Sequence, residues 1–208
     1  MSQMTQRRYG IAWIAALSLT ACVSGFESRA PVTDVYVLRP TIEASRSLQD
    51  LRVQILPVRV RSGYATEAIL RSGPDRTLDV LAASRWPDAL PRMWEGLLVD
   101  GLKSSGFGDV LEPLSSARAD WLIQVVIRRF DLDETRSGER AVRIEMDVTV
   151  MDRTRRESRL SFAVEAQVPV IENRMRAIIA AFEQASTQIL TDIALRLGES
   201  DWRQAAGS

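Results

Sequence analysis

Two stretches of strict alternation between apolar and polar residues constrain the fold more than any other feature of the sequence. The first covers residues 142–150 and the second covers residues 160–168. The apolar positions are Val142, Ile144, Met146, Val148 and Val150 in the first stretch, and Leu160, Phe162, Val164, Ala166 and Val168 in the second. A period of two places one face of each strand in the core and the other in water, as in an antiparallel sheet. Because the polar connection at residues 152–157 is short, the two strands are predicted to form a hairpin.

Further strands are expected where apolar residues are bounded by turn residues. These segments are residues 35–38, stopped by Pro40; residues 51–60; two hairpin arms at 68–70 and 77–81 around Gly73-Pro74-Asp75; and residues 121–130. In the segment 51–60 apolar side chains fall on both faces, which indicates a central strand or a bulge near Pro57.

Two helices complete the predicted fold. Trp86, Leu90, Met93, Trp94, Leu97, Leu98 and Leu102 recur at the spacing of one helical stripe. Because Pro91 is tolerated only in a first turn, this helix is expected to begin near Asp88 as its N-cap, and Gly106 is expected to end it. A second stripe runs from Met175 to Leu197 and stops at Gly198. The predicted class is α+β, an antiparallel β-sheet with two long α-helices packed on one face.

The N-terminus has the three-part layout of a bacterial secretory signal. Arg7-Arg8 precede an apolar run at residues 9–19, which ends in Leu19-Thr20-Ala21-Cys22. The run is shorter than the roughly 20 apolar residues that a bilayer span needs. The ending resembles a lipobox, in which Cys22 would be acylated and become the first mature residue. The alternatives are an ordinary cleaved signal with an incidental cysteine, and an apolar helix of the core.

This interpretation divides the chain into four parts. We expect a lipoprotein signal peptide at residues 1–21, a lipidated Cys22 with a flexible tether at 22–33, one folded domain at 34–198, and a disordered tail at 199–208. Several acyl chains would hold the domain firmly to a membrane, whereas one chain would be marginal. Val23 follows the cysteine, where an Asp favours inner-membrane retention in such lipoproteins. The resemblance therefore implies the outer membrane, facing the periplasm.

The composition argues against several classes of function. The chain has no His, and 27 basic residues balance 27 acidic ones. A Ser-His-Asp or Cys-His arrangement cannot be built, and no global charge favours nucleic acid. The carboxylate pairs Asp131 with Asp133 and Glu165 with Glu172 could do acid/base work, but acidic residues beside Arg are more typical of a solvated face. We predict no enzymatic activity, no cofactor and no metal site.

Several motifs, in order and spacing, resemble one known family. They are Tyr36-Val37-Leu38-Arg39-Pro40, the segment from Gly63-Tyr64 to Ile69, the segment from Ser84 to Pro91, Ser104-Ser105-Gly106-Phe107, Ala119-Asp120, Arg129-Phe130 and Ala180-Ala181-Phe182. Together with the lipobox they resemble the auxiliary lipoprotein component of MCE-type ABC lipid transport systems, the paraquat-inducible protein C family. The resemblance runs from about Val35 to Leu197.

The resemblance implies a non-enzymatic accessory at the outer membrane. Its expected partners are an MCE protein and, through it, an inner-membrane ABC permease and ATPase; homo-oligomerisation is left open. The rival hypothesis is an outer-membrane lipoprotein with a structural or regulatory role, such as activating a cell-wall synthase. An enzyme acting on envelope substrates is a third class, disfavoured by the missing residues.

Two aromatic residues are candidate partner contacts besides the lipidation site Cys22. Trp86 opens the first helical stripe, which favours a core position over a contact, although Trp is enriched at interfaces. Tyr64 lies in a Gly-containing turn, where exposed aromatics are a common contact type. A lipid groove between the sheet and the helices is a further alternative to simple core packing.

Overall fold

The fold is built around one mixed β-sheet. The structure is a computed structural model that describes residues 33–42, 48–135 and 138–199. Within these residues the sheet has nine strands. They are β1 (Asp34–Val35), β2 (Leu48–Ile55), β3 (Arg59–Val60), β4 (Ala68–Ser72), β5 (Leu78–Arg85), β6 (Phe107–Leu111), β7 (Trp121–Asp133), β8 (Ala141–Asp152) and β9 (Ser158–Pro169).

Strand β7 is the centre of the sheet, and its two sides differ. On one side it pairs antiparallel with β8 over its whole length. On the other side β2, β3 and β4 follow one another along it, all parallel to β7. The prediction of an antiparallel sheet was therefore wrong in this half of the fold. Parallel neighbours need a long crossover, and the chain between β4 and β7 supplies one that contains a helix.

The two predicted hairpins are confirmed. Strands β8 and β9 pair antiparallel with Met146 opposite Val164, and β4 pairs antiparallel with β5. The predicted interruption near Pro57 is also confirmed, since β2 ends at Ile55 and β3 begins at Arg59, with both strands on β7. Strand β6, which the sequence did not predict, pairs parallel with β2.

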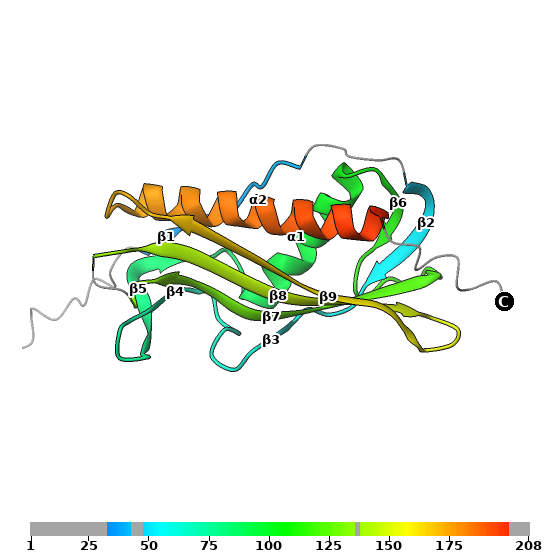
Figure 1. The fold of residues 1–208 in the computed structure, drawn as a ribbon, viewed down its shortest axis with the longest axis horizontal. Helices are drawn as coiled ribbons and strands as arrows, with labels where there is room; N and C mark the ends of the chain where they lie inside the picture. The colour runs from blue at the N-terminus through cyan, green and yellow to red at the C-terminus, as the bar shows by residue number, and fades with distance from the viewer. Residues whose placement is uncertain (1–32, 43–47, 136–137, 200–208) are drawn as a thin grey trace, which may run out of the picture. The chain divides into compact units, whose positions relative to one another are not determined.

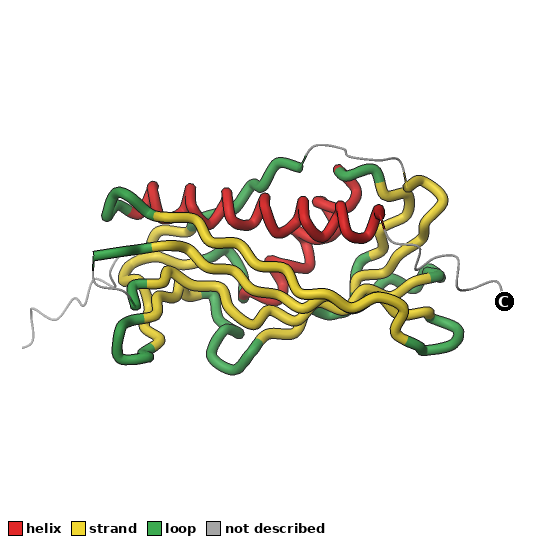
Figure 2. Tube along the Cα trace, viewed as in Figure 1, coloured by secondary structure: helices red, strands yellow, loops and turns green. Residues whose placement is uncertain are grey.

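Two helices cover one face of the sheet, as predicted (Figures 1 and 2). Helix α1 (Leu90–Ser104) packs against β2, β3 and β6, and helix α2 (Met175–Glu199) packs against β8 and β9. Within the residues described, no helix combines the length and apolar character that crossing a bilayer requires.

The ends of α1 correct one expectation and confirm another. Asp88 is not the N-cap, because Ala89 keeps an extended backbone with ψ 141° and the helix begins at Leu90. Asp88 Oδ1 accepts a hydrogen bond from the Ala89 N–H at 2.7 Å. At the other end Gly106 has φ 93°, and its N–H donates to Lys103 O at 3.1 Å. This is the left-handed stop that the sequence predicted.

An aromatic cluster fills the core between the helices and the sheet. Trp86, Trp94, Phe130 and Phe182 are all buried. Trp86 contacts Phe182 edge to face with ring centroids 5.2 Å apart, and Trp94 contacts Phe130 in the same way at 5.9 Å. The cluster therefore joins α1, through Trp94, and α2, through Phe182, to Phe130 of β7.

Candidate functional site

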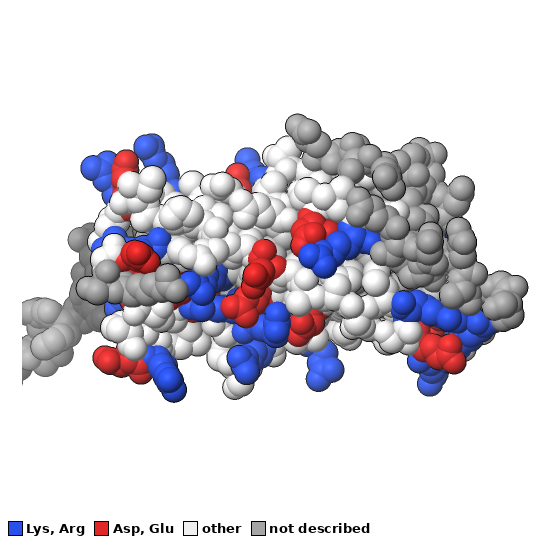
Figure 3. Space-filling model, in the orientation of Figure 1, with Lys and Arg blue, Asp and Glu red and all other residues white. Residues whose placement is uncertain are grey.

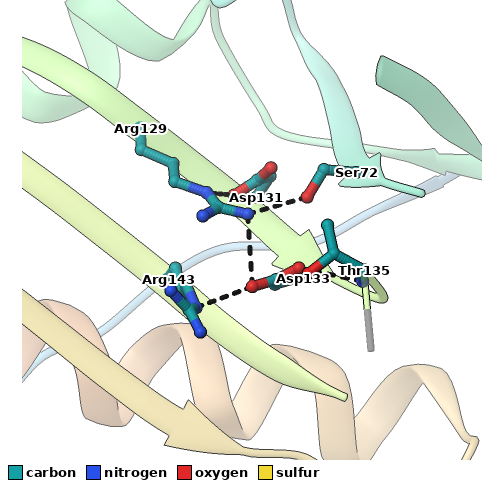
Figure 4. A network of polar contacts seen from close by, with 6 residues as sticks. All are labelled: Ser72, Arg129, Asp131, Asp133, Thr135 and Arg143. Carbon is teal, nitrogen blue, oxygen red and sulfur yellow. Dashed lines mark hydrogen bonds and ion pairs between the residues drawn. The ribbon is translucent and has the colours of Figure 1, made fainter. Parts of the chain in front are cut away.

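A group of paired charges lies on the sheet face opposite the helices. Phe130 and Leu132 of β7 are buried in the core, so alternation along the strand turns Arg129, Asp131 and Asp133 to the outer face. Arg143 of β8 is the register partner of Asp131 and joins them there. Figure 4 shows these four residues, which we call the outer-face cluster, with Ser72 and Thr135.

Two arginines neutralise the two carboxylates of the cluster. Arg129 Nε donates to Asp131 Oδ1 at 2.7 Å, and Arg129 Nη2 lies 3.4 Å from Asp133 Oδ2. Arg143 Nε lies 2.7 Å from that same Asp133 oxygen. Burial by itself would raise the pKa of Asp133, but hydrogen bonds from Thr135 and the charges of Arg129 and Arg143 outweigh it and lower the pKa. Asp131 and Asp133 are therefore held as ion-paired carboxylates.

The second carboxylate pair considered for acid/base work is not held together. Glu165 lies on the exposed face of β9, whereas Glu172 pairs with Arg174 at 3.7 Å in the loop before α2. In the part of the chain that the structure describes, no group of His, Cys, Asp and Glu could hold a metal ion.

Tyr64 is buried beside Asp131 and Arg129 of the outer-face cluster and does not lie on the surface. Its side chain is only 8% exposed, so the expectation of an exposed loop aromatic was wrong. Gly63 has φ 95°, and the Tyr64 N–H donates to Arg61 O at 3.1 Å, so a tight turn folds the ring back onto the sheet. Burial raises the pKa of Tyr64 to about 12, and the negative charge of Asp131 adds to the effect. Whether Tyr64 contacts a partner stays a prediction.

The raised pKa of Tyr64 predicts an alkaline loss of stability. An unfolded tyrosine has a pKa of 10.0, so the contribution of this group is complete below pH 10 and is lost as the pH rises through about 12. By pH 11 the wild type should lose about 1 kcal/mol more than Tyr64→Phe, because only the wild type must keep a buried hydroxyl protonated. Urea unfolding of both proteins at pH 9 and pH 11 measures this difference. Equal losses would contradict the burial of the hydroxyl.

Trp86 occupies the core position that its place in the helical stripe favoured. It is 1% exposed and its backbone N–H donates to Glu67 O at 2.7 Å. Its core role is confirmed, and a role in partner contact is untested. Cys22, the predicted lipidation site, lies outside the described residues.

Comparison with known proteins identifies the domain. Residues 36–194 match the family of ABC-type transport auxiliary lipoprotein components. The chain belongs to this family. Protein XCC0632 from Xanthomonas campestris has a similar fold, with a TM-score of 0.75 at 19% identity over 85% of this chain and 100% of that chain. An uncharacterized protein has a TM-score of 0.62 at 15% identity, over 80% of this chain and 99% of that chain. Hypothetical protein CT253 from Chlamydia trachomatis has a TM-score of 0.50 at 13% identity, over 70% of this chain and 94% of that chain. No curated protein matches the sequence.

This auxiliary lipoprotein component exposes several apolar side chains, two of which lie at the start of the folded domain. Val35 is 46% exposed and Val37 is 52% exposed, whereas Leu38 beside them is 5% exposed. We call Val35 and Val37 the edge patch, because β1 is the last strand on its side of the sheet. The sequence predicted a strand here. Val35 and Val37 alternate with the half-buried Tyr36 and the buried Leu38, and this alternation could have predicted which face of the strand is exposed.

A small cavity lies beside the edge patch. Its volume is about 190 Å³, and it is lined by Leu38, Arg39, Pro40, Ile42, Leu97, Asp100, Gly101 and Ser104. These residues come from the segment after β1 and from α1, and none comes from a strand. A Cβ at Gly101 would lie 2.8 Å from Ile42 Cδ1, so a larger residue here would require the Ile42 side chain to shift. The cavity therefore differs in place from the predicted groove between sheet and helices.

Proposed function

We propose that the protein is a lipid-anchored, non-enzymatic accessory subunit of an MCE-type ABC system that moves lipids between the inner and outer membranes. The observation that carries the proposal is the family match at residues 36–194, preceded by Leu19-Thr20-Ala21-Cys22. The lipobox resemblance supports an outer-membrane anchor facing the periplasm. ATP would be hydrolysed by a different subunit.

The polar chemistry of the described residues supports an accessory role. Asp131 is ion-paired with Arg129, and Asp133 with both Arg129 and Arg143, an arrangement more typical of structural carboxylates than of a general base. A buried network of this kind serves to specify a packing arrangement or to hold a loop. Here Asp131 of the network interacts with the side chain of Tyr64.

The edge patch is the surface that fits a protein partner best. Val35 and Val37 are exposed and apolar, and they follow the proposed tether in the chain. Exposed apolar residues at an open sheet edge are a common feature of protein contacts. Because Tyr64 and Trp86 are buried, a partner in this conformation would meet the edge patch more readily than either aromatic ring.

The anchor predicts that Cys22→Ser abolishes acylation. The variant has no thiol to modify, and it should therefore leave the membrane fraction for the soluble fraction of the periplasm. Cells labelled with a radioactive fatty acid and then fractionated would show both effects. Equal label in variant and wild type would remove the basis for the lipoprotein assignment of this cysteine.

The transport role is tested by crosslinking in intact cells. A photoreactive residue at Val37 should form an adduct with the periplasmic part of an MCE protein, and one at the exposed turn residue Thr154 serves as the control. Recovery of an MCE protein from the Val37 position, but not from Thr154, supports the proposal. Recovery of a cell-wall synthase without any MCE protein would favour a structural or regulatory role in the envelope.

A further inference from the structure

Two loops lie at the same end of the sheet. Strands β4 and β7 run parallel and finish level with each other, with Ser72 beside Asp133. Strand β8 begins and β9 ends at the same level, with Ala141 opposite Pro169. The turn from β4 to β5 and the loop from β9 to α2 therefore share this end, on the left of Figure 1. We call it the β9–α2 end.

Strand β1 is directed away from the β9–α2 end. It runs parallel to β5, with Asp34 beside Ser84, and β5 itself begins at the β9–α2 end, where Leu78 pairs with Ser72. The N-terminal end of β1 is therefore turned toward the β9–α2 end. The interval from Cys22 to Asp34 allows at most roughly 40 Å of extended chain. An anchor at Cys22 would thus permit this end to reach the surface of the bilayer.

The loop from β9 to α2 carries the most exposed large apolar side chain of the described residues. Ile171 is 95% exposed, whereas Val170 before it is 8% exposed. Hydrogen bonds hold the backbone on both sides of Ile171. The Val170 N–H donates to Arg140 O at 2.8 Å, and the Arg174 N–H donates to Glu172 O at 2.8 Å. The isoleucine therefore projects from a constrained turn at this end of the sheet.

The charges beside Ile171 suit a phospholipid surface. Glu172 pairs with Arg174 at 3.7 Å, and Arg176 is exposed in the first turn of α2. Figure 3 shows acidic and basic side chains intermixed at the β9–α2 end, so no large acidic field would repel phosphate groups. An apolar side chain flanked by arginines is typical of contacts with lipid headgroups.

We propose that the β9–α2 end rests on a phospholipid bilayer, with Ile171 inserted below the headgroups and Arg176 at the level of the phosphates. The inference rests on the proposed anchor at Cys22, which would keep the domain beside the membrane. One apolar side chain binds a bilayer only weakly, so its effect is to orient a domain that the acyl chains already hold. The opposite end of the sheet, with the turn from β8 to β9, then faces the periplasm.

Leu114 provides a matched control toward that opposite end. It is 85% exposed, and its loop is also held in place, because Gln54 Nε2 donates to Ser115 O at 3.2 Å. Gln54 Oε1 accepts a hydrogen bond at 3.1 Å from Arg153, which lies in the turn from β8 to β9. Leu114 is therefore similar to Ile171 in exposure and apolar character but lies away from the proposed membrane contact.

The contact is tested with a fluorophore at each of the two positions. Cys22 is the only native cysteine, and its thiol would be blocked by acylation. The variants Ile171→Cys and Leu114→Cys, as full-length acylated proteins, are labelled with nitrobenzoxadiazole on the new thiol. They are then reconstituted into vesicles of phosphatidylcholine and phosphatidylglycerol in equal parts, with and without a nitroxide on the acyl chains. Circular dichroism melts verify that both variants fold.

We expect the nitroxide lipids to quench the label at position 171 and to leave the label at position 114 unquenched. The same fluorophore at both positions controls for insertion driven by the label itself. Quenching at position 171 that is no stronger than at position 114 would overturn the inference alone, because flotation with the vesicles reports the anchor separately. Failure of the wild type to float with the vesicles would contradict the anchor and the contact together.

Discussion

Trp86→Ala is expected to lower the free energy of unfolding by about 3 to 5 kcal/mol, the usual cost of truncating a large buried aromatic. Trp86 is 1% exposed, and its ring contacts Phe130 and Phe182 with centroids 5.8 and 5.2 Å away. The change would leave a cavity where α2 meets the sheet, and rigid neighbours on both sides limit its collapse. Denaturant unfolding followed by tryptophan fluorescence and circular dichroism measures the effect.

Val37→Ala is the control for this prediction. Val37 is 52% exposed, so its truncation should change the free energy of unfolding by less than about 0.5 kcal/mol. In the crosslinking experiment we expect the opposite order of effects. Val37→Ala should reduce recovery of the partner more than Trp86→Ala does, since Val37 belongs to the proposed contact and Trp86 does not. Similar unfolding midpoints for the two variants would show that the aromatic cluster is not the centre of the core.

Local periodicity was sufficient to predict the elements of this fold that lie close in sequence. Alternation in β8 and β9 assigned Met146 and Val164 to the core, and both are at most 1% exposed. The hairpin followed because its turn is short. Helix α1 was predicted to within a few residues, with its start displaced because Ala89 remains extended.

Pairing between distant strands could not be obtained in the same way. The parallel contacts of β2, β3 and β4 with β7 join segments separated by many tens of residues, and no local pattern encodes such a register. Strand β6 was missed because the segment at Gly106 and Phe107 was interpreted only as the end of the preceding helix. In the structure Phe107 both follows Gly106 and opens a strand beside β2.

The burial of Tyr64 was the main error about the candidate site. Turn composition indicated an exposed ring, but exposure of a loop residue depends on the surface beneath it. Here that surface is β7, where the parallel pairing of β3 brings the turn over Asp131 and Arg129. A bulge between Ile127 and Arg129 also shifts the alternation of β7, so Asp131 could not be assigned to a face from the sequence.

Arg129→Met is expected to lower the free energy of unfolding by about 3 to 5 kcal/mol, because it leaves buried carboxylates without their shared cation. Asp131 is 0% exposed and Asp133 is 6% exposed. Arg128→Met is the matched control on the adjacent residue. Arg128 pairs with Asp147 at 3.3 Å, but both side chains are more than 40% exposed, so the loss should be below about 1 kcal/mol.

The defect of Arg129→Met should also shrink as the pH falls. In the wild type the pKa of Asp133 is lowered, so its stabilising contribution is present above the pKa of an unfolded aspartate and is lost as the pH falls through the folded value. In the variant, the Arg129 charge no longer opposes the effect of burial, so the pKa of Asp133 should rise above its wild-type value, and protonation of Asp133 then removes part of the uncompensated charge. Urea unfolding of both proteins at pH 7 and pH 4.5 should therefore give a smaller difference at pH 4.5. A difference that stays constant with pH would mean that Arg129 stabilises the domain by packing of its side chain and not by neutralising Asp131 and Asp133.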